Sequence, residues 1–269
     1  MSKVKDVWQN TARLRNNIKR IRIGLLTFLF SFFSANAYFD MNPTWSDQVT
    51  IVIHPTNVKK NADVDAFIKT LKQSDIDEVS EFISKNATYY RGSNTEVRYV
   101  LGSTMDEPPQ DATEEDALSI LAVAGWSLKF RWYAISNMKK EDIGADAVIY
   151  LNFAPDDHST LNRSTALQRG RIALVNIHAG KDNIRMGNMV LAHESLHLFG
   201  AVDQYDLGFG SPIYPNGYAE PNKVPLYPQT KAEIMGGYIP INEVDFLVPN
   251  SLDEVVILAQ TAKDIGWLK

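Results

Sequence analysis

Two of the five histidines in this 269-residue chain stand four residues apart, in the stretch NMVLAHESLHLFGAVDQYD at 188–206. On an α-helix, residues i and i+4 lie on the same face, so His193 and His197 would project side by side. Gly200 follows three residues later, and a glycine readily adopts the left-handed conformation that ends a helix and reverses the chain. A fold that contains this stretch would therefore return Asp203 to the two imidazoles.

The side chains of this stretch suit a hydrolytic metal centre. Two imidazoles and one carboxylate would provide three ligands and leave the fourth position of a tetrahedral ion open, as a catalytic site requires. Glu194 is rotated off the face of His193 and His197, so it would reach a water on the metal without binding the ion itself. The pattern predicts His193, His197 and Asp203 as metal ligands and Glu194 as general base. An ordinary core helix with two histidines would require neither the glutamate, the glycine nor the aspartate.

The stretch HESLHLFGAVD resembles the H-E-x-x-H-x-x-G-x-x-H/D signature of the metzincin clan of zinc metallopeptidases, in its variant with aspartate as third ligand. Met235, in EIMGGY, stands downstream of the motif, where the clan has its methionine turn. EDALSILAVAGWSLKFRWYAI and GADAVIYLNF are similar to a helix and strands of matrixin-like members. The resemblance covers about residues 95–269 and implies an endopeptidase that uses Zn²⁺ to hydrolyse protein or peptide substrates.

The resemblance also implies a fold and one further site residue. The expected fold is of the α/β (α+β) class, with a twisted mixed five-stranded sheet, a long active-site helix, the methionine turn and a C-terminal helix. Tyr238 is the candidate for a tyrosine that donates a hydrogen bond in the transition state, although it stands three residues after Met235 and relatives usually place theirs two after. The chain has no cysteine, which excludes disulfides, a thiol nucleophile and a cysteine switch.

Local patterns predict an alternation of strands and helices, which also indicates the α/β class. Strands are expected at 49–55, 96–102, 129–136, 146–153 and 171–179. Besides the motif helix, helices are expected at 63–85, at 113–126 with a Thr113/Asp116 capping box, and at 251–267 with a Ser251/Glu254 capping box. In the last helix, Leu252, Val255, Val256 and Ala259 should face the core. Irregular loops are expected at 154–170 and 207–229, the second dense in glycine and proline.

The N-terminal residues have the features of a secretory signal peptide. Seven lysines and arginines precede an apolar run at 23–33, and small residues follow at Ala35 and Ala37. This pattern predicts a signal peptide at 1–37 and a secreted or periplasmic protein. The apolar run is short for a membrane span of roughly 20 residues. The alternative is an uncleaved anchor, and we expect contact with the membrane only through this segment.

Domain organisation and partners follow from the remaining residues. Residues 38–94, which the resemblance does not cover, are expected to form an accessory or propeptide-like region, and residues 95–269 the catalytic domain. The formal net charge is −5, with no basic stripe beyond the N-terminus, which argues against nucleic-acid binding. We expect a monomer.

Two other functions are compatible with the two histidines. In a gluzincin-type peptidase the third ligand is a downstream glutamate, for which the chain offers Glu220, Glu233 and Glu243. None of them lies in a convincing second helix. A non-catalytic exported module would instead hold a structural metal closed by a fourth protein ligand. The intact Glu194 argues against such a module.

Three other side chains could bind metal by residue type alone. His158 and His178 lie where matrixins hold a second zinc, but Thr160 replaces the aspartate expected near the first, so ordinary histidines are predicted. Asp206 is a candidate Ca²⁺ ligand, although acidic loop residues are more often simply solvated.

Overall fold

The computed structural model describes the whole chain except residues 1, 114–118, 158–159 and 207, and the chain divides into two compact units. The first, Met1–Asp40, consists of helix α1 (Ser2–Met41). Its segment Asn17–Met41 has 25 residues and a mean hydropathy of 1.3, so it is long and apolar enough to cross a membrane. A signal sequence has the same properties, so α1 is compatible with either the expected signal peptide or the anchor.

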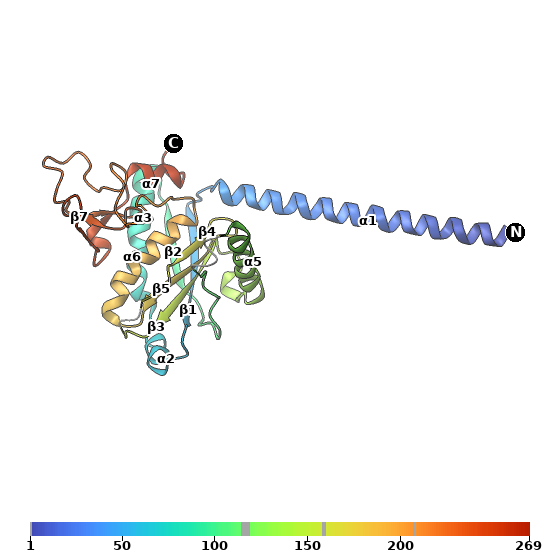
Figure 1. Cartoon of the computed structure of the whole chain (residues 1–269), viewed down its shortest axis with the longest axis horizontal. Helices are drawn as coiled ribbons and strands as arrows, with labels where there is room; N and C mark the ends of the chain where they lie inside the picture. Colours follow the sequence, from blue (N-terminus) through green and yellow to red (C-terminus); the bar gives the residue numbers. More distant parts are fainter. Residues whose placement is uncertain (1, 114–118, 158–159, 207) are drawn as a thin grey trace. The chain divides into compact units, whose positions relative to one another are not determined.

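The second unit, Met41–Lys269, is built on a five-stranded mixed sheet with strand order β2-β1-β3-β5-β4 (Figure 1). Its strands are β1 (Gln48–Asn57), β2 (Glu96–Leu101), β3 (Ala147–Ala154), β4 (Thr165–Leu167) and β5 (Ile172–His178). Four of them run parallel, and β4 pairs antiparallel with β5 at one edge. Ile51 lies opposite Tyr99 on one side and Ala147 on the other, so β1 is an interior strand.

Helices cover both faces of this sheet (Figure 1). They are α2 (Ala62–Ile68), α3 (Asp77–Arg91), α5 (Ile120–Ser136), α6 (Lys181–His197) and α7 (Ala259–Asp264). Alternate residues of β3 point to opposite faces, so Leu151 joins the larger core beneath α3 and α6, while Tyr150 joins the smaller core beneath α5. The sheet therefore lies between two helical layers, and the mixed α/β class predicted from the sequence is confirmed.

The strand predictions at 49–55, 96–102, 146–153 and 171–179 are confirmed, but the one at 129–136 is wrong because these residues belong to α5. Phe130 and Tyr133 pack against Tyr150 with ring centroids 5.8 and 5.2 Å away. A spacing of three residues puts both rings on one helical face, so packing overrides the strand propensity of this aromatic segment. Asp116 of the capping box expected at Thr113/Asp116 lies among residues 114–118, outside the described residues.

The continuous helix predicted at 251–267 is also wrong. The segment forms a 3₁₀ turn η3 (Leu252–Glu254), strand β9 (Val255–Val256) and the short helix α7. Strand β9 pairs in parallel with β6 (Ala232–Glu233), and the backbone N–H of Leu258 donates to the Glu233 carboxylate. These long-range bonds hold the segment extended until Leu258. Ala259, which was expected in the core, is exposed.

Residues 41–94 are part of the same compact unit as residues 95–269. They supply the interior strand β1 and helices α2 and α3. Trp45 packs its ring 4.4 Å from that of Phe199 and 5.2 Å from that of Trp267, and its indole N–H donates to the Ile265 carbonyl at 2.7 Å. The boundary expected near residue 94 is therefore not a division between compact units, because the sheet needs β1 to join β2 to β3.

Candidate metal centre

Helix α6 presents the two motif histidines at its C-terminal end. Leu191, Ala192 and Leu196 point into the core and fix the rotation of the helix, which leaves His193 and His197 partly buried on its flank. After the helix ends, the amide of Ala201 donates back to the Leu196 carbonyl at 3.1 Å. This bond closes the turn that redirects the chain.

Gly200 makes this turn possible, as predicted. Its φ is 108°, in the region that side chains strongly disfavour. A Cβ at this position would also lie 2.9 Å from the Gln168 side-chain nitrogen and 3.2 Å from the Asp264 carbonyl oxygen. Both the backbone angle and the space require glycine here, and the reversed chain brings Asp203 back to α6.

The three predicted ligand atoms form a nearly equilateral triangle. The Nε2 atoms of His193 and His197 are 3.1 Å apart, and Asp203 Oδ1 lies 3.2 and 3.1 Å from them. A tetrahedral ion about 2.0–2.1 Å from each ligand would hold neighbouring ligand atoms about 3.3–3.4 Å apart. Among the described residues, this is the one group of three or more metal-ligand side chains that converges.

The hydrogen bonds around the triangle direct lone pairs toward its centre. His193 Nδ1 is 2.8 Å from the Ile234 carbonyl, and His197 Nδ1 is 2.8 Å from the Ala201 carbonyl. Because a carbonyl can only accept, each Nδ1 carries the hydrogen and each Nε2 is left with a lone pair. Asp203 Oδ1 is buried, and the polar atoms that face it are the two Nε2 atoms of the triangle. Three acceptors that face one another in this way fit a bound cation.

Electrostatics at the triangle also favour positive charge. Burial lowers the pKa of His193, but its hydrogen bond to Asp203 and the charge of Glu194 outweigh this effect and raise the pKa to about 9. Burial raises the pKa of Asp203, yet the neighbouring His193 and His197 bring it well below its usual range. A proton would thus occupy the triangle in the absence of a metal ion, and a metal ion would have to displace it.

Glu194 lies beside the triangle, in the wall of a cleft of about 1100 Å³. The cleft is also lined by His197, Asp203 and Tyr205, and by the chain from Thr160 to Ala166, which includes the start of edge strand β4. Burial raises the pKa of Glu194, which makes its carboxylate a stronger base than an exposed one.

Tyr205 is the tyrosine at this site, and the sequence reasoning missed it. Its ring stacks on the His193 imidazole with centroids 6.4 Å apart, and burial and the charge of Asp203 raise its pKa to about 12. The predicted Tyr238 does not line the cleft, and its hydroxyl lies 3.8 Å from where a Cβ of Gly210 would be. The position two residues after Asp203 was the available signal, since so short a segment must stay near the ligand.

Met235 is fully buried, and the turn around it is hydrogen-bonded to the segments that carry His193 and Asp203. Its carbonyl accepts the amide of Gln204 at 2.8 Å, next to Asp203 in sequence, and the preceding Ile234 carbonyl accepts from His193. The turn is held by Glu233, whose carboxylate accepts four hydrogen bonds. Burial raises the pKa of Glu233, and these four donors oppose the shift.

The glutamates considered as alternative ligands lie outside the converging group. Glu220 accepts the amide and hydroxyl of Thr230, Glu233 is occupied by its four donors, and Glu243 is exposed. Asp206 accepts the amides of Gly208 and Phe209 at 2.9 Å and so caps a turn.

The two histidines considered for a second metal site differ in how far they can be described. His178 lies with its Nδ1 2.9 Å from the Pro155 carbonyl. His158 falls outside the described residues.

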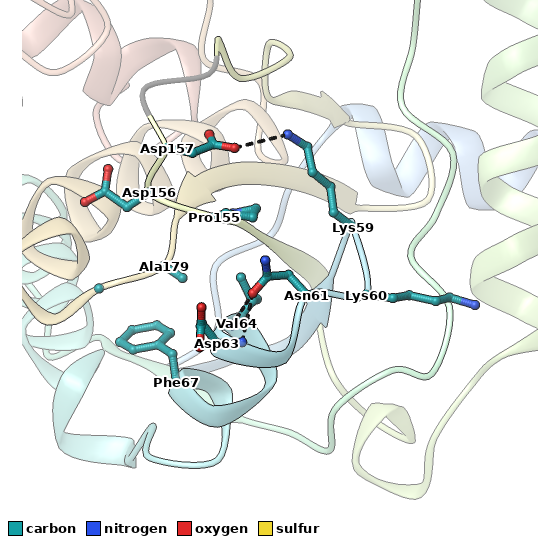
Figure 2. Close-up of a pocket in the computed structure, with 11 residues that line it drawn as sticks. Lys59, Lys60, Asn61, Asp63, Val64, Phe67, Pro155, Asp156, Asp157 and Ala179 are labelled. Atoms are coloured by element: carbon teal, nitrogen blue, oxygen red, sulfur yellow. Dashed lines mark hydrogen bonds and ion pairs between the residues drawn. The ribbon is translucent and has the colours of Figure 1, made fainter.

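A second hollow, of about 770 Å³, lies at the carboxyl ends of β1, β3 and β5 (Figure 2). Figure 2 shows Lys59 directed toward Asp157, whose carboxylate is 3.8 Å from its amine, and Asn61 capping the start of α2. Its carboxylates do not form a converging ligand group. Within the described part of the chain, side chains that could bind a metal ion converge only in the cleft beside α6.

Comparisons with known proteins add little to this geometry. No family model and no curated protein matches the chain. One similar solved structure is a "Structure of a chaperone-substrate complex", with 14% sequence identity and a TM-score of 0.39 over 82% of this chain and 34% of the other. This chain spans about a third of that protein's length, and so weak a likeness carries no argument about fold or function.

Proposed function

We propose that this protein is a zinc-dependent endopeptidase of the metzincin type. The observation that carries the proposal is the triangle of His193 Nε2, His197 Nε2 and Asp203 Oδ1, with edges of 3.1–3.2 Å. Three protein ligands beside an open cleft suit a catalytic metal, whereas a structural site would be closed by a fourth ligand. The five-stranded mixed sheet, the motif helix and the buried Met235 agree with the fold that the motif implies.

The protein's own side chains supply the acid–base chemistry. Zinc, when bound by His193, His197 and Asp203, supplies the positive charge that polarises a water molecule and the scissile carbonyl. Glu194 takes the proton of that water and later gives it to the leaving amine, and its raised pKa suits both transfers. The Tyr205 hydroxyl, protonated at neutral pH because its pKa is about 12, donates a hydrogen bond to the charge that develops on the carbonyl oxygen.

The cleft supports an extended peptide as substrate. Its wall includes β4, an edge strand whose outer side has no neighbouring strand in the five-stranded sheet. Arg163 lies in the same wall and is exposed. Its positive charge opposes the burial that raises the pKa values of Glu194 and Tyr205. We propose that the enzyme works outside the cytoplasm, with α1 as its signal peptide or membrane anchor.

The decisive experiment compares the wild type with Glu194→Gln in digestion of casein or gelatin, with and without a chelator. We expect the wild type to digest the protein substrate only without chelator, and Glu194→Gln to lose turnover by several orders of magnitude while it retains one zinc per chain. Glu243→Gln, an exposed change of the same chemistry, is the matched control. Full activity of Glu194→Gln, or a wild type inactive even when loaded with zinc, would end the assignment.

A further inference from the structure

Helix α5 has apolar side chains on two opposite faces. Trp126 and Phe130 are buried against the sheet. On the opposite side, Leu121, Leu128, Trp132 and Ile135 are 84%, 66%, 71% and 64% exposed. Their spacings of seven, four and three residues place these four side chains in one stripe along the helix, which we call the outer stripe.

Two more exposed apolar side chains follow the helix in sequence. Met138 and Ile143, in the segment that follows α5, are 58% and 76% exposed. A helix that is apolar all round is normally buried, and a contiguous exposed patch of this kind marks an interaction surface. The fold already accounts for the inner face of α5, so the outer stripe needs a separate explanation.

Positive charge borders the C-terminal half of the outer stripe. Lys129 and Arg131 lie within α5, which contains no acidic residue, and Lys139 and Lys140 follow it. The acidic residues that come next are engaged elsewhere: Glu141 accepts the amide of Ser103 at 2.8 Å, and Asp142 lies 2.7 Å from the buried His54. Residues 114–116 are acidic and precede the helix, so the charge argument concerns the part from Leu128 onward.

We propose that the outer stripe lies in the interface of a lipid bilayer, with Leu128, Trp132 and Ile135 against the acyl chains and the flanking lysines at the headgroups. Apolar side chains bordered by lysine and arginine are typical of helices that lie in the membrane surface, and tryptophan favours the interface. The lysine stems can cover apolar surface while the amines remain in water. This contact is additional to any made by α1, departs from the expectation that only the N-terminal segment meets the membrane, and does not depend on the peptidase assignment.

Two features of the chain favour a bilayer over a second copy of the protein. Residues 42–47, which link α1 to β1, span at most about 22 Å when extended, so a membrane-inserted α1 would keep the second unit beside the bilayer. In a symmetric dimer, by contrast, the outer stripe would meet its own copy, and the basic residues of two α5 helices would be brought together.

The lack of cysteine allows a direct test with the full chain in vesicles. Leu128→Cys would carry a nitroxide spin label, and Val224→Cys, 94% exposed in an irregular loop, is the matched control. In phosphatidylcholine vesicles with about one third phosphatidylglycerol, collisions with oxygen and with a water-soluble nickel chelate would be measured for both labels. We expect the ratio of oxygen to nickel collisions to be at least fivefold higher at position 128 than at position 224.

Two results would overturn the proposal. One is an equal collision ratio at positions 128 and 224, which would place the outer stripe in water. The other is protection of position 128 from both reagents, together with spin–spin broadening that disappears on dilution with unlabelled protein, which would assign the outer stripe to a second copy. The same comparison with a label at Ile135→Cys, further along the stripe, excludes a local effect of one substitution.

Discussion

Replacing Glu233 should weaken the metal centre without changing any metal ligand. One oxygen of this buried carboxylate accepts the amides of Met235 and Gly236 at 2.6 and 3.1 Å. The other accepts the amide of Leu258 at 3.2 Å and the hydroxyl of Thr261 at 2.7 Å. All four partners are donors. The ionised carboxylate can accept from all of them, whereas a glutamine amide has one acceptor oxygen and cannot.

The cost of Glu233→Gln follows from these contacts. The amide oxygen of glutamine can still accept from Met235 and Gly236, and the Thr261 hydroxyl can rotate to accept from the new NH₂ group. The Leu258 amide then has no acceptor, and one unsatisfied buried donor costs about 1–3 kcal/mol. We therefore expect a loss of about 2 kcal/mol in the free energy of unfolding, within the total of about 5–15 kcal/mol for a typical domain. Glu233→Ala would leave the Met235 and Leu258 amides without an acceptor, whereas the Gly236 amide keeps its bond to the backbone carbonyl of residue 233 at 2.9 Å, so this change should cost about twice as much as Glu233→Gln.

Glu233→Gln should also weaken zinc binding, because Glu233 holds the turn next to His193. Glu233 fixes the turn that places the Ile234 carbonyl 2.8 Å from His193 Nδ1, and this bond sets the hydrogen position on the imidazole. Loss of such outer hydrogen bonds typically weakens metal binding by about 10–100-fold. We expect the zinc dissociation constant of Glu233→Gln to rise by at least about tenfold.

Denaturant unfolding of the metal-free protein and zinc competition with a chromophoric chelator would measure the two effects separately. Glu243 is an exposed glutamate in the same C-terminal part. Glu243→Gln should change neither the free energy of unfolding nor the free energy of zinc binding by more than about 0.5 kcal/mol. If Glu233→Gln unfolds at the same denaturant concentration as the wild type and binds zinc equally well, this account of the turn is wrong.

Three further predictions concern the cleft. Tyr205→Phe should lower kcat about a hundredfold with zinc content unchanged, whereas Tyr238→Phe should leave kcat within about twofold. A larger loss of kcat in Tyr238→Phe than in Tyr205→Phe would instead assign the hydrogen-bond donor to Tyr238. Asp203→Ala should lose zinc at micromolar concentrations while Glu220→Ala retains it, as plasma emission spectrometry of dialysed protein would show, and the opposite result would favour a downstream glutamate ligand. Because the pKa of His193 rises from 6.5 to about 9, its proton stabilises the metal-free fold fully below about pH 6.5, and this stabilisation is lost as pH rises toward 9. Zinc must displace that proton, so zinc affinity should rise about tenfold per pH unit over this window, and a pH-independent affinity measured by competition would contradict the assignment.

The sequence alone determined the parts of this protein that depend on neighbours along the chain. Four of the five predicted strands appear as expected, and the helical prediction at 63–85 corresponds to α2 and most of α3, because these patterns repeat within single elements. His193 and His197 were predictable as a pair because the helix itself places them on one face. Gly200 was recognisable because few residues other than glycine adopt its φ of 108°.

The tertiary structure decided whatever depends on partners distant in sequence. The segment 129–136 is helical because its aromatic rings pack on Tyr150. The last predicted helix is interrupted because the Leu258 amide donates to the Glu233 carboxylate. Residues 41–94 are part of the sheet because β1 lies between β2 and β3. Tyr205, and not Tyr238, lines the cleft of the candidate metal centre because the turn at Gly200 folds its segment back toward α6. Such contacts join residues from 12 to about a hundred positions apart, so the periodicity of one segment does not reveal them.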